Sequence, residues 1–250
     1  MKNIVITRSI NQISDISELL TDLGMNPVQF PCIEIDSLEY KENLFKELEM
    51  LNNYDWILFT SRNTVKVISE IINENHMNIN WNHIKVGAIG PETGKMLSNA
   101  LKISEVFTPE SSNFKSFTDE LPIMINEKVL VPQSKIADNK IVDNLEKKNI
   151  FVQKIIAYDL KLGSGGENVP KMLKENSIDA VIFTSGSTVT NFLKRTHPEN
   201  SKNTPVFCMG ETAYKMALKE GFNFVFKPNK STLIDTVGLL KNYFIEASRE

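Results

Sequence analysis

Short, nearly continuous apolar runs alternate along this chain with segments whose apolar residues recur at helical spacing. Such runs are typical of strands covered on both faces, as in parallel sheets, because neither face of the strand meets water. Strands that alternate with helices predict βαβ units, so we expect an α/β protein whose parallel sheets are flanked by helices. The strands are expected at 3–8, 27–35, 56–61, 85–90, 128–133, 152–160, 180–185 and 205–210, with helices between them that include 13–24, 63–72, 92–101, 139–149, 188–195 and 211–221.

The chain carries the same sequence pattern twice. WILFTSRNTV at 56–65 matches AVIFTSGSTV at 180–189, with Phe-Thr-Ser after an apolar run in both copies. Two further blocks repeat in the same order, which indicates a duplication and therefore two similar α/β lobes. In the first, AIGPETGKML at 88–97 matches CMGETAYKMAL at 208–218. In the second, IVITRS at 4–9, with LLTDLGMNPVQFPCIEI after it, matches VLVPQS at 129–134, with NLEKKNIFVQKIIAYDL after it.

Composition narrows the class of function. The 250 residues are 41% hydrophobic and 24% charged, as in a soluble globular protein of one large or two modest domains. The formal net charge of −3 disfavours a general nucleic-acid binder, which would be basic. Cys32 and Cys208 lie in separate apolar runs, which predicts buried free thiols. No run is long enough for a signal peptide or a membrane span, so a cytoplasmic location is expected.

Hydroxyl groups follow the strands where the apolar runs stop. In parallel sheets, ligands bind beyond the carboxyl ends of the strands, where helix N-termini offer N–H groups to an anion. Serine is also a common N-cap, so Ser61 and Ser185 have a purely structural interpretation as well. Gly90 and Gly210 are expected to let the chain turn tightly after a strand. The candidate anion-binding residues are Thr60, Ser61, Arg62, Gly90, Thr93, Thr184, Ser185, Ser187, Gly210 and Thr212.

Other catalytic motifs are weak in this sequence. It contains no Gly-Lys-Ser/Thr phosphate loop, no GxGxxG and no GxSxG. The three histidines, His76, His83 and His197, lie in polar segments without ligand spacing, so we expect surface residues and no metal site.

Two further residues stand at predicted strand ends. Arg8 ends the first strand, where it would either bind a carboxylate in bidentate fashion or simply reach solvent. Tyr158 ends the run IIAY, where it is either a half-buried structural tyrosine or a phenol that donates a proton.

Taken together, these blocks resemble the uroporphyrinogen-III synthase family. The resemblance rests on motifs that span nearly the whole chain in the family's order. They are VITRS (5–9), ILFTSRNTV (57–65), AIGPETGKML (88–97), IIAYDL (155–160), VIFTSGSTVTNF (181–192) and MGETAYKMAL (209–218).

The resemblance implies two α/β lobes joined by a two-stranded linker, with the active cleft between them. Carried onto this chain, residues 1–34 and 161–250 form lobe one, and residues 38–153 form lobe two. The inter-lobe linker strands are expected at 31–37 and 153–160.

The resemblance also implies an activity. Members of this family are lyases of haem biosynthesis that cyclise the linear tetrapyrrole hydroxymethylbilane to uroporphyrinogen III, with loss of water and inversion of ring D. We therefore expect a cytoplasmic, monomeric enzyme without a metal or organic cofactor, which binds no nucleic acid or membrane and contacts the enzyme supplying hydroxymethylbilane transiently. Tyr158 is expected to assist departure of the hydroxyl group, and the listed hydroxyls and helix starts to position substrate carboxylates.

The chain departs from the family pattern at two places, and two other classes of function stay open. The stretch PQSKIADNK (132–140) lacks arginines, so that Lys135 is the nearest cation, and MGETAY (209–214) lacks the proline of its counterpart.

The main alternative is a non-catalytic two-lobed binding module for an anionic small molecule. A two-lobed glycosyltransferase is a weaker alternative, because no clear nucleotide-sugar site is found.

Overall fold

The computed structural model describes residues 1–9 and 13–247; residues 10–12 and 248–250, which fall within the range expected for lobe one, lie outside the described residues. The chain divides into two compact units. The first unit comprises Met1–Glu34 and Lys161–Glu250, and the second comprises Ile35–Leu160. Each unit contains one five-stranded sheet.

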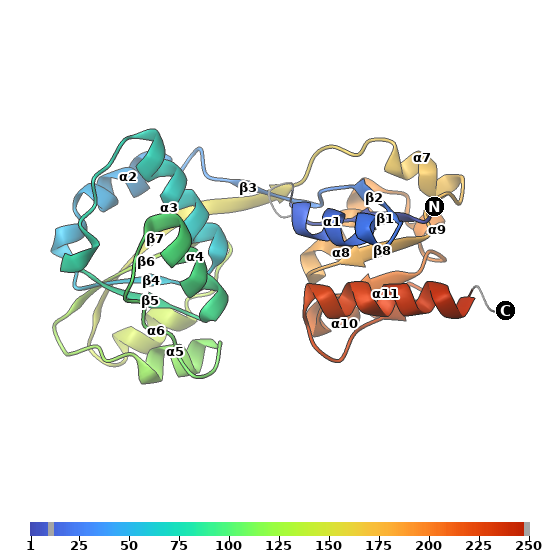
Figure 1. The fold of residues 1–250 in the computed structure, drawn as a ribbon. Helices are drawn as coiled ribbons and strands as arrows, with labels where there is room; N and C mark the ends of the chain where they lie inside the picture. Colours follow the sequence, from blue (N-terminus) through green and yellow to red (C-terminus); the bar gives the residue numbers. More distant parts are fainter. Residues whose placement is uncertain (10–12, 248–250) are drawn as a thin grey trace. The chain divides into compact units, whose positions relative to one another are not determined.

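The first unit has the strand order β10-β9-β8-β1-β2, and each strand is parallel to its neighbours. One face of this sheet packs on α1 and α11 around Ile4, Ile6 and Leu240, and Figure 1 shows α11 in red along the sheet. The other face packs on α7, α8 and α10 around Phe183 and Phe192. The elements are β1 (Asn3–Ile6), α1 (Ser14–Asp22), β2 (Asn26–Gln29), α7 (Val169–Lys174), β8 (Ala180–Phe183), α8 (Gly186–Arg195), α9 (Pro198–Ser201), β9 (Val206–Cys208), α10 (Glu211–Lys219), β10 (Val225–Phe226) and α11 (Leu233–Ala247).

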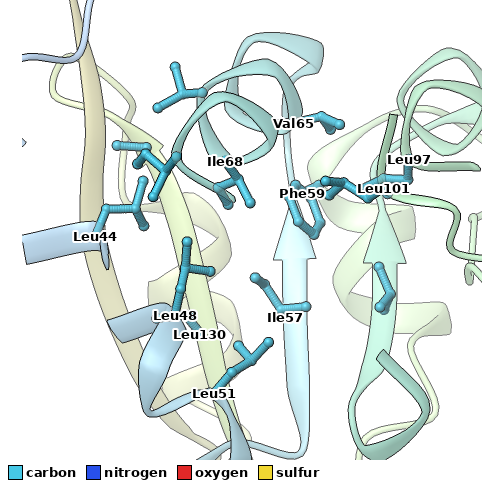
Figure 2. Close-up of a cluster of buried hydrophobic side chains, with 14 of the residues drawn as sticks. Leu44, Leu48, Leu51, Ile57, Phe59, Val65, Ile68, Leu97, Leu101 and Leu130 are labelled. Carbon is cyan, nitrogen blue, oxygen red and sulfur yellow. The ribbon is translucent and has the colours of Figure 1, made fainter. Parts of the chain in front are cut away.

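The second unit has the strand order β3-β7-β6-β4-β5, and β7, β6, β4 and β5 run parallel. Figure 2 shows one face of this sheet, where Ile57 and Phe59 of β4 pack against α2, α3 and α4. The opposite face packs on α5 and α6 through residues such as Phe117 and Leu145. The elements are β3 (Ile33–Asp36), α2 (Lys41–Glu49), η2 (Leu51–Asn53), β4 (Trp56–Phe59), α3 (Arg62–Glu74), η3 (Trp81–His83), β5 (Lys85–Ala88), α4 (Pro91–Leu101), α5 (Phe114–Glu120), β6 (Lys128–Ser134), α6 (Lys140–Glu146) and β7 (Phe151–Leu162).

The two sheets repeat the same topology, so the sequence repeat is also a structural one. The strand order β9-β8-β1-β2 of the first unit corresponds to β5-β4-β6-β7 of the second. The register agrees as well: Ile4 of β1 lies opposite Ala180 of β8, and Val129 of β6 lies opposite Trp56 of β4. The predicted α/β class and the duplication are therefore confirmed at the level of individual strand partners.

The structure also contains helices that the apolar pattern did not indicate, namely α2, α5, α7 and α11. The expected end of the first helix is confirmed, because Gly24 follows α1 with a φ of 71°. The glycine-rich stretch 161–170 is closely packed against the rest of the first unit. A Cβ atom at Gly166 would collide with the carbonyl oxygen of Gln29, and Arg195 donates a hydrogen bond of 2.5 Å from Nη2 to the carbonyl oxygen of Gly165.

Candidate functional site

The predicted residues lie at the carboxyl ends of the parallel strands in both units, except Tyr158, which lies within β7 opposite Ser134, the last residue of β6. Because parallel strands point the same way, the loops after neighbouring strands meet along one edge of each sheet. The first unit contributes Arg8, Thr184, Ser185, Ser187, Gly210 and Thr212, and the second contributes Thr60, Ser61, Arg62, Gly90, Thr93 and Tyr158.

The start of α8 in the first unit is fully capped. The Ser185 hydroxyl accepts a hydrogen bond of 3.3 Å from the backbone N–H of Thr188, and the Thr188 hydroxyl accepts one of 3.2 Å from the backbone N–H of Ser185. This reciprocal pair is a capping box. A further hydrogen bond of 2.9 Å links the Ser185 and Ser187 hydroxyls. The structural interpretation of Ser185 as a cap is therefore correct, whether or not the residue also binds a ligand.

The same edge of the first unit brings the starts of α8 and α10 together. A Cβ atom at Gly186 would lie 3.3 Å from the carbonyl oxygen of Thr212. Thr212 is exposed, while Thr184 and Arg8 are half-buried at the ends of β8 and β1. Gly210 is the N-cap residue of α10.

The start of α3 in the second unit is capped in a different way. The Ser61 hydroxyl accepts a hydrogen bond of 3.1 Å from the backbone N–H of Asn63, and it also accepts one of 3.3 Å from the Tyr158 hydroxyl of β7. Tyr158 is 4% exposed and so more deeply buried than its position in the sequence suggested. Thr64 occupies the position that Thr188 holds in α8, and its buried hydroxyl has no hydrogen-bond partner among the described residues. The helix start of the second unit therefore lacks the reciprocal capping bond.

The expected role of Gly90 and Gly210 as tight-turn glycines is wrong. Both residues are extended, with φ values of −172° and −147°, and any residue can adopt such angles. Gly90 is required for space instead, because a Cβ atom there would collide with the Ser112 side chain. Ser112 thus lies against the start of α4, a proximity that no spacing rule in the sequence indicates. Thr93, one turn into α4, is buried.

Lys135, which directly follows β6 at this edge of the second sheet, is already paired. Its ammonium group lies 3.4 Å from a carboxylate oxygen of Asp159 and 5.9 Å from the centre of the Tyr40 ring. The neighbouring Tyr40 phenol, and after it the Asp159 carboxylate, raise the pKa of the Lys135 ammonium. Lys135 is therefore charged, and part of its charge is balanced within the protein.

The remaining features are the two thiols, of which Cys208 is the last residue of β9, and a hollow in the second unit. Cys32 and Cys208 are buried free thiols, as predicted; burial raises the pKa of each to about 12, and for Cys32 the nearby Arg195 opposes this rise. A hollow of about 860 Å³ lies at the opposite end of the second sheet, beside Trp56 and Lys85, and none of the predicted residues lines it. Within the described part of the chain, no three His, Cys, Asp or Glu side chains are grouped to hold a metal, and no helix could span a membrane.

These features define a class: a duplicated α/β protein with hydroxyl-bearing helix starts, suited to anionic groups, at the edge of each sheet. The model of the family "Uroporphyrinogen-III synthase HemD" matches residues 14–236. The chain therefore belongs to the uroporphyrinogen-III synthase HemD family, a family of enzymes of tetrapyrrole biosynthesis that act on a small molecule. The family expected from the sequence motifs is confirmed.

Two curated relatives are similar to this chain. It is 28% identical to the "Porphyrin biosynthesis protein HemD" of Ruminiclostridium josui over 234 residues, which are 92% of this chain and 46% of that protein. The chain thus spans about half the length of this relative. It is 29% identical to the "Putative uroporphyrinogen-III synthase" of Methanocaldococcus jannaschii over 227 residues, which are 88% of this chain and 90% of that protein.

Solved structures share the fold. A mutant uroporphyrinogen III synthase from Thermus thermophilus matches with a TM-score of 0.65 at 14% identity, over 98% of this chain and all of that one. The uroporphyrinogen-III synthetase from Helicobacter pylori matches with a TM-score of 0.64 at 18% identity, over 97% of this chain and all of that one. At these identities the likeness concerns the fold alone.

Proposed function

We propose that this protein is a uroporphyrinogen-III synthase, which closes hydroxymethylbilane to uroporphyrinogen III with loss of water and inversion of ring D. The observation that carries the proposal is that the family model spans residues 14–236, over both copies of the repeated Phe-Thr-Ser block. The helix starts after these blocks add support, because N–H and hydroxyl donors suit a substrate whose pyrrole rings all carry carboxylates.

In this proposal, binding depends on neutral donors more than on cations. Backbone N–H groups are available at the starts of α3, α4, α8 and α10. The helix dipole is positive at these ends and therefore favours a carboxylate there. Ser61, Thr60 and Thr184 lie beside these starts and add hydroxyl donors. Such contacts are consistent with a net charge of −3, which offers no general attraction to a polyanion.

The chemistry that these residues must promote is a ring closure. Departure of hydroxide from the terminal hydroxymethyl group leaves an azafulvene cation that the pyrrole nitrogen stabilises. The substituted carbon of ring D then attacks it to give a spiro-pyrrolenine, which rearranges and loses a proton, so that the net loss is one water. Most of the catalysis in this scheme is orientation of the two chain ends, because orientation decides which carbon of ring D reacts.

Tyr158 is the residue we propose to assist the departing hydroxide. Its one O–H proton is donated to the Ser61 hydroxyl at 3.3 Å, so in this step the proton turns from Ser61 to the departing oxygen. A phenol that donates a proton to hydroxide turns a poor leaving group into water.

A coupled assay tests the proposed activity. Hydroxymethylbilane is generated in place with and without the protein, and the oxidised uroporphyrin isomers are then separated. Predominantly isomer III is expected. Isomer I alone, the spontaneous product, would contradict the proposal and favour the non-catalytic binding module. Thermal stabilisation by nucleotide sugars but not by tetrapyrroles would favour a glycosyltransferase instead.

The expectations on assembly and setting belong to the same proposal. The chain would work as a monomer in the cytoplasm, without a metal or an organic cofactor, and would contact the enzyme that supplies hydroxymethylbilane transiently. Light scattering should then give a mass near the 28.4 kDa of one chain. Activity should survive dialysis against a chelator, and a stable dimer or a loss of activity on chelation would contradict these points.

A further inference from the structure

Arg195, the last residue of α8, binds both segments by which the chain passes between the two units. The first unit ends at Glu34 and resumes at Lys161, so the chain crosses between the units at these two places. The Arg195 guanidinium donates from Nη1 to the carbonyl oxygen of Pro31, shortly before the first crossing. It donates from Nη2 to that of Gly165, shortly after the second crossing, at 2.5 Å. One side chain therefore ties both crossings to the first unit.

Neighbouring contacts hold this guanidinium and the first crossing in place. Its central carbon lies 4.0 Å from the centre of the buried Phe30 ring, so the cation stacks on an aromatic face. One turn earlier in α8, the Asn191 side-chain amide donates to the carbonyl oxygen of Cys32 at 2.9 Å. A Cβ atom at Gly163 would collide with the carbonyl group of Pro31, so the second crossing packs directly on the first.

At the corresponding place the second unit has apolar side chains, and the two sheets show why. The sequence repeat aligns Asn191 and Arg195 of α8 with Val67 and Ile71 of α3, which are buried in an apolar cluster. In the second sheet β7 has β3 on its outer side, whereas its counterpart β2 is the outermost strand of the first sheet. The carbonyl groups that follow β2 therefore take their hydrogen bonds from side chains of α8.

Secure crossings matter to a reaction that uses residues of both units. The proposed ring closure takes contacts from helix starts in both units and depends on orientation, which loose crossings would impair. The ten residues of α8 place Arg195 about 14 Å from the start of the helix, so it is not among the proposed carboxylate contacts. We propose that Arg195 is a positioning residue for this reaction, which acts by anchoring the two crossings to the first unit. The effect on turnover rests on the proposed function, whereas the anchoring does not.

The two buried thiols give a local test of the anchor. Cys32 lies beside the first crossing, whereas Cys208 ends β9. Arg195→Met keeps a long side chain but removes both hydrogen bonds. We expect alkylation of Cys32 by iodoacetamide at pH 8, followed by mass spectrometry, to accelerate at least about tenfold more than that of Cys208. Loss of the Arg195 charge raises the pKa of Cys32 further and by itself slows alkylation, so a faster rate reports opening of the crossing.

The coupled assay with hydroxymethylbilane tests the role in the reaction. Arg195→Met should lower kcat about tenfold and change the KM by less than about twofold, because the carboxylate contacts are kept and orientation is lost. Arg195→Lys keeps the charge but lacks the planar fork that reaches two carbonyl groups at once, so both of its effects should be intermediate. Circular dichroism checks that each variant is folded, and Arg195→Lys carries the test alone if Arg195→Met does not fold.

Lys194→Met provides the matched control. Lys194 lies beside Arg195 in the last turn of α8 and is exposed. The variant removes the same charge from the same end of the helix dipole but leaves the hydrogen bonds to both crossings in place. Neither the alkylation of Cys32 nor kcat should change.

Equal acceleration at Cys32 and Cys208 in the Arg195 variants, or none at either thiol, would overturn the inference, because Arg195 would then not hold the crossings. An unchanged kcat despite faster alkylation of Cys32 would overturn the role in the reaction. Formation of isomer III by the unaltered protein tests the proposed function separately. If isomer III forms, the thiols and kcat decide on Arg195 alone. If only isomer I forms, the proposed function and the role of Arg195 in it fail together.

Discussion

The starts of α3 and α8 share nearly the same sequence, yet they use it differently. In α8, Ser185 and Thr188 bond each other's backbone N–H groups and close the helix start on itself. At the start of α3, the Ser61 hydroxyl accepts a hydrogen bond from the Tyr158 hydroxyl of β7, and the Thr64 hydroxyl has no partner among the described residues. The local sequence therefore sets the helix start in both units, and a residue distant in the sequence decides how its hydroxyls are used.

The repeat shows where the difference comes from. When the blocks LLTDLGMNPVQFPCIEI and NLEKKNIFVQKIIAYDL are aligned, Tyr158 falls opposite Ile33, which has no hydroxyl to donate. The first unit consequently has no hydroxyl at this position that could donate a hydrogen bond to Ser185 in competition with the backbone N–H of Thr188. Within the proposed function, we assign the stronger carboxylate contact to the start of α3, whose serine and threonine do not cap each other, and the weaker one to the fully capped start of α8.

The largest expected effect is on turnover. Tyr158→Phe should lower kcat about 100-fold if the phenol donates a proton to the leaving hydroxide. Stability should change by about 1 kcal/mol at most, since a single hydrogen bond is lost. Steady-state rates with hydroxymethylbilane measure the first effect and urea denaturation the second. Full turnover in this variant would remove Tyr158 from the chemistry and leave it only the task of holding Ser61.

The serine caps should differ in their contribution to stability. Ser185→Ala loses one cap and should cost about 1 kcal/mol, with the unfolding followed by circular dichroism in urea. Ser61→Ala should cost about 2 kcal/mol, because the buried Tyr158 hydroxyl loses its partner in addition to the lost cap. Equal costs for the two variants would show that the hydrogen bond between Tyr158 and Ser61 adds nothing to stability.

The two threonines should give effects of opposite sign. Thr188→Val breaks the capping box and should lower the free energy of unfolding by about 1 kcal/mol. Thr64→Val removes an unpaired buried hydroxyl at nearly constant volume and should raise it by up to about 1 kcal/mol. Destabilisation by Thr64→Val would mean that its hydroxyl is paired, and the two helix starts would then be alike.

At neutral pH the smallest effect is that of the thiols, both of which lie in the first unit, although this effect grows steeply in alkali. Burial keeps Cys32 and Cys208 protonated in the folded state up to a pKa of about 12, whereas the thiols of the unfolded chain ionise near pH 9. Unfolding therefore releases protons between these values, so stability should fall as the pH rises above about 9. Iodoacetamide at pH 8 should leave both thiols unmodified in the folded protein, and rapid alkylation would show that the first unit opens readily.

Much of the fold could be predicted from the sequence, because buried parallel strands are continuous apolar runs. The repeated blocks also indicated the duplication, which the strand partners confirm. Helices α2 and α11 were not predicted, since neither belongs to a repeated block. The cap of α11 was overlooked: the Thr232 hydroxyl accepts a hydrogen bond of 3.1 Å from the backbone N–H of Asp235. The role of Gly90 depends on Ser112, which reaches it from a later loop, and no local rule could reveal that contact.

The candidate site could be predicted only in part. The pattern indicated which strand ends carry hydroxyls, and these residues do lie at the carboxyl edges of the two sheets. It could not indicate that Thr188 is paired while Thr64 is not, because the partner of Ser61 comes from β7.

The measurement that tests this account most directly is the KM for hydroxymethylbilane of Ser61→Ala beside that of Ser185→Ala, each checked to be folded. The account assigns the stronger carboxylate contact to the open helix start. It predicts that Ser61→Ala raises the KM about tenfold and Ser185→Ala by about threefold at most, as expected for the loss of a strong and a weak hydrogen bond. A larger rise for Ser185→Ala, or no change in either variant, would contradict it.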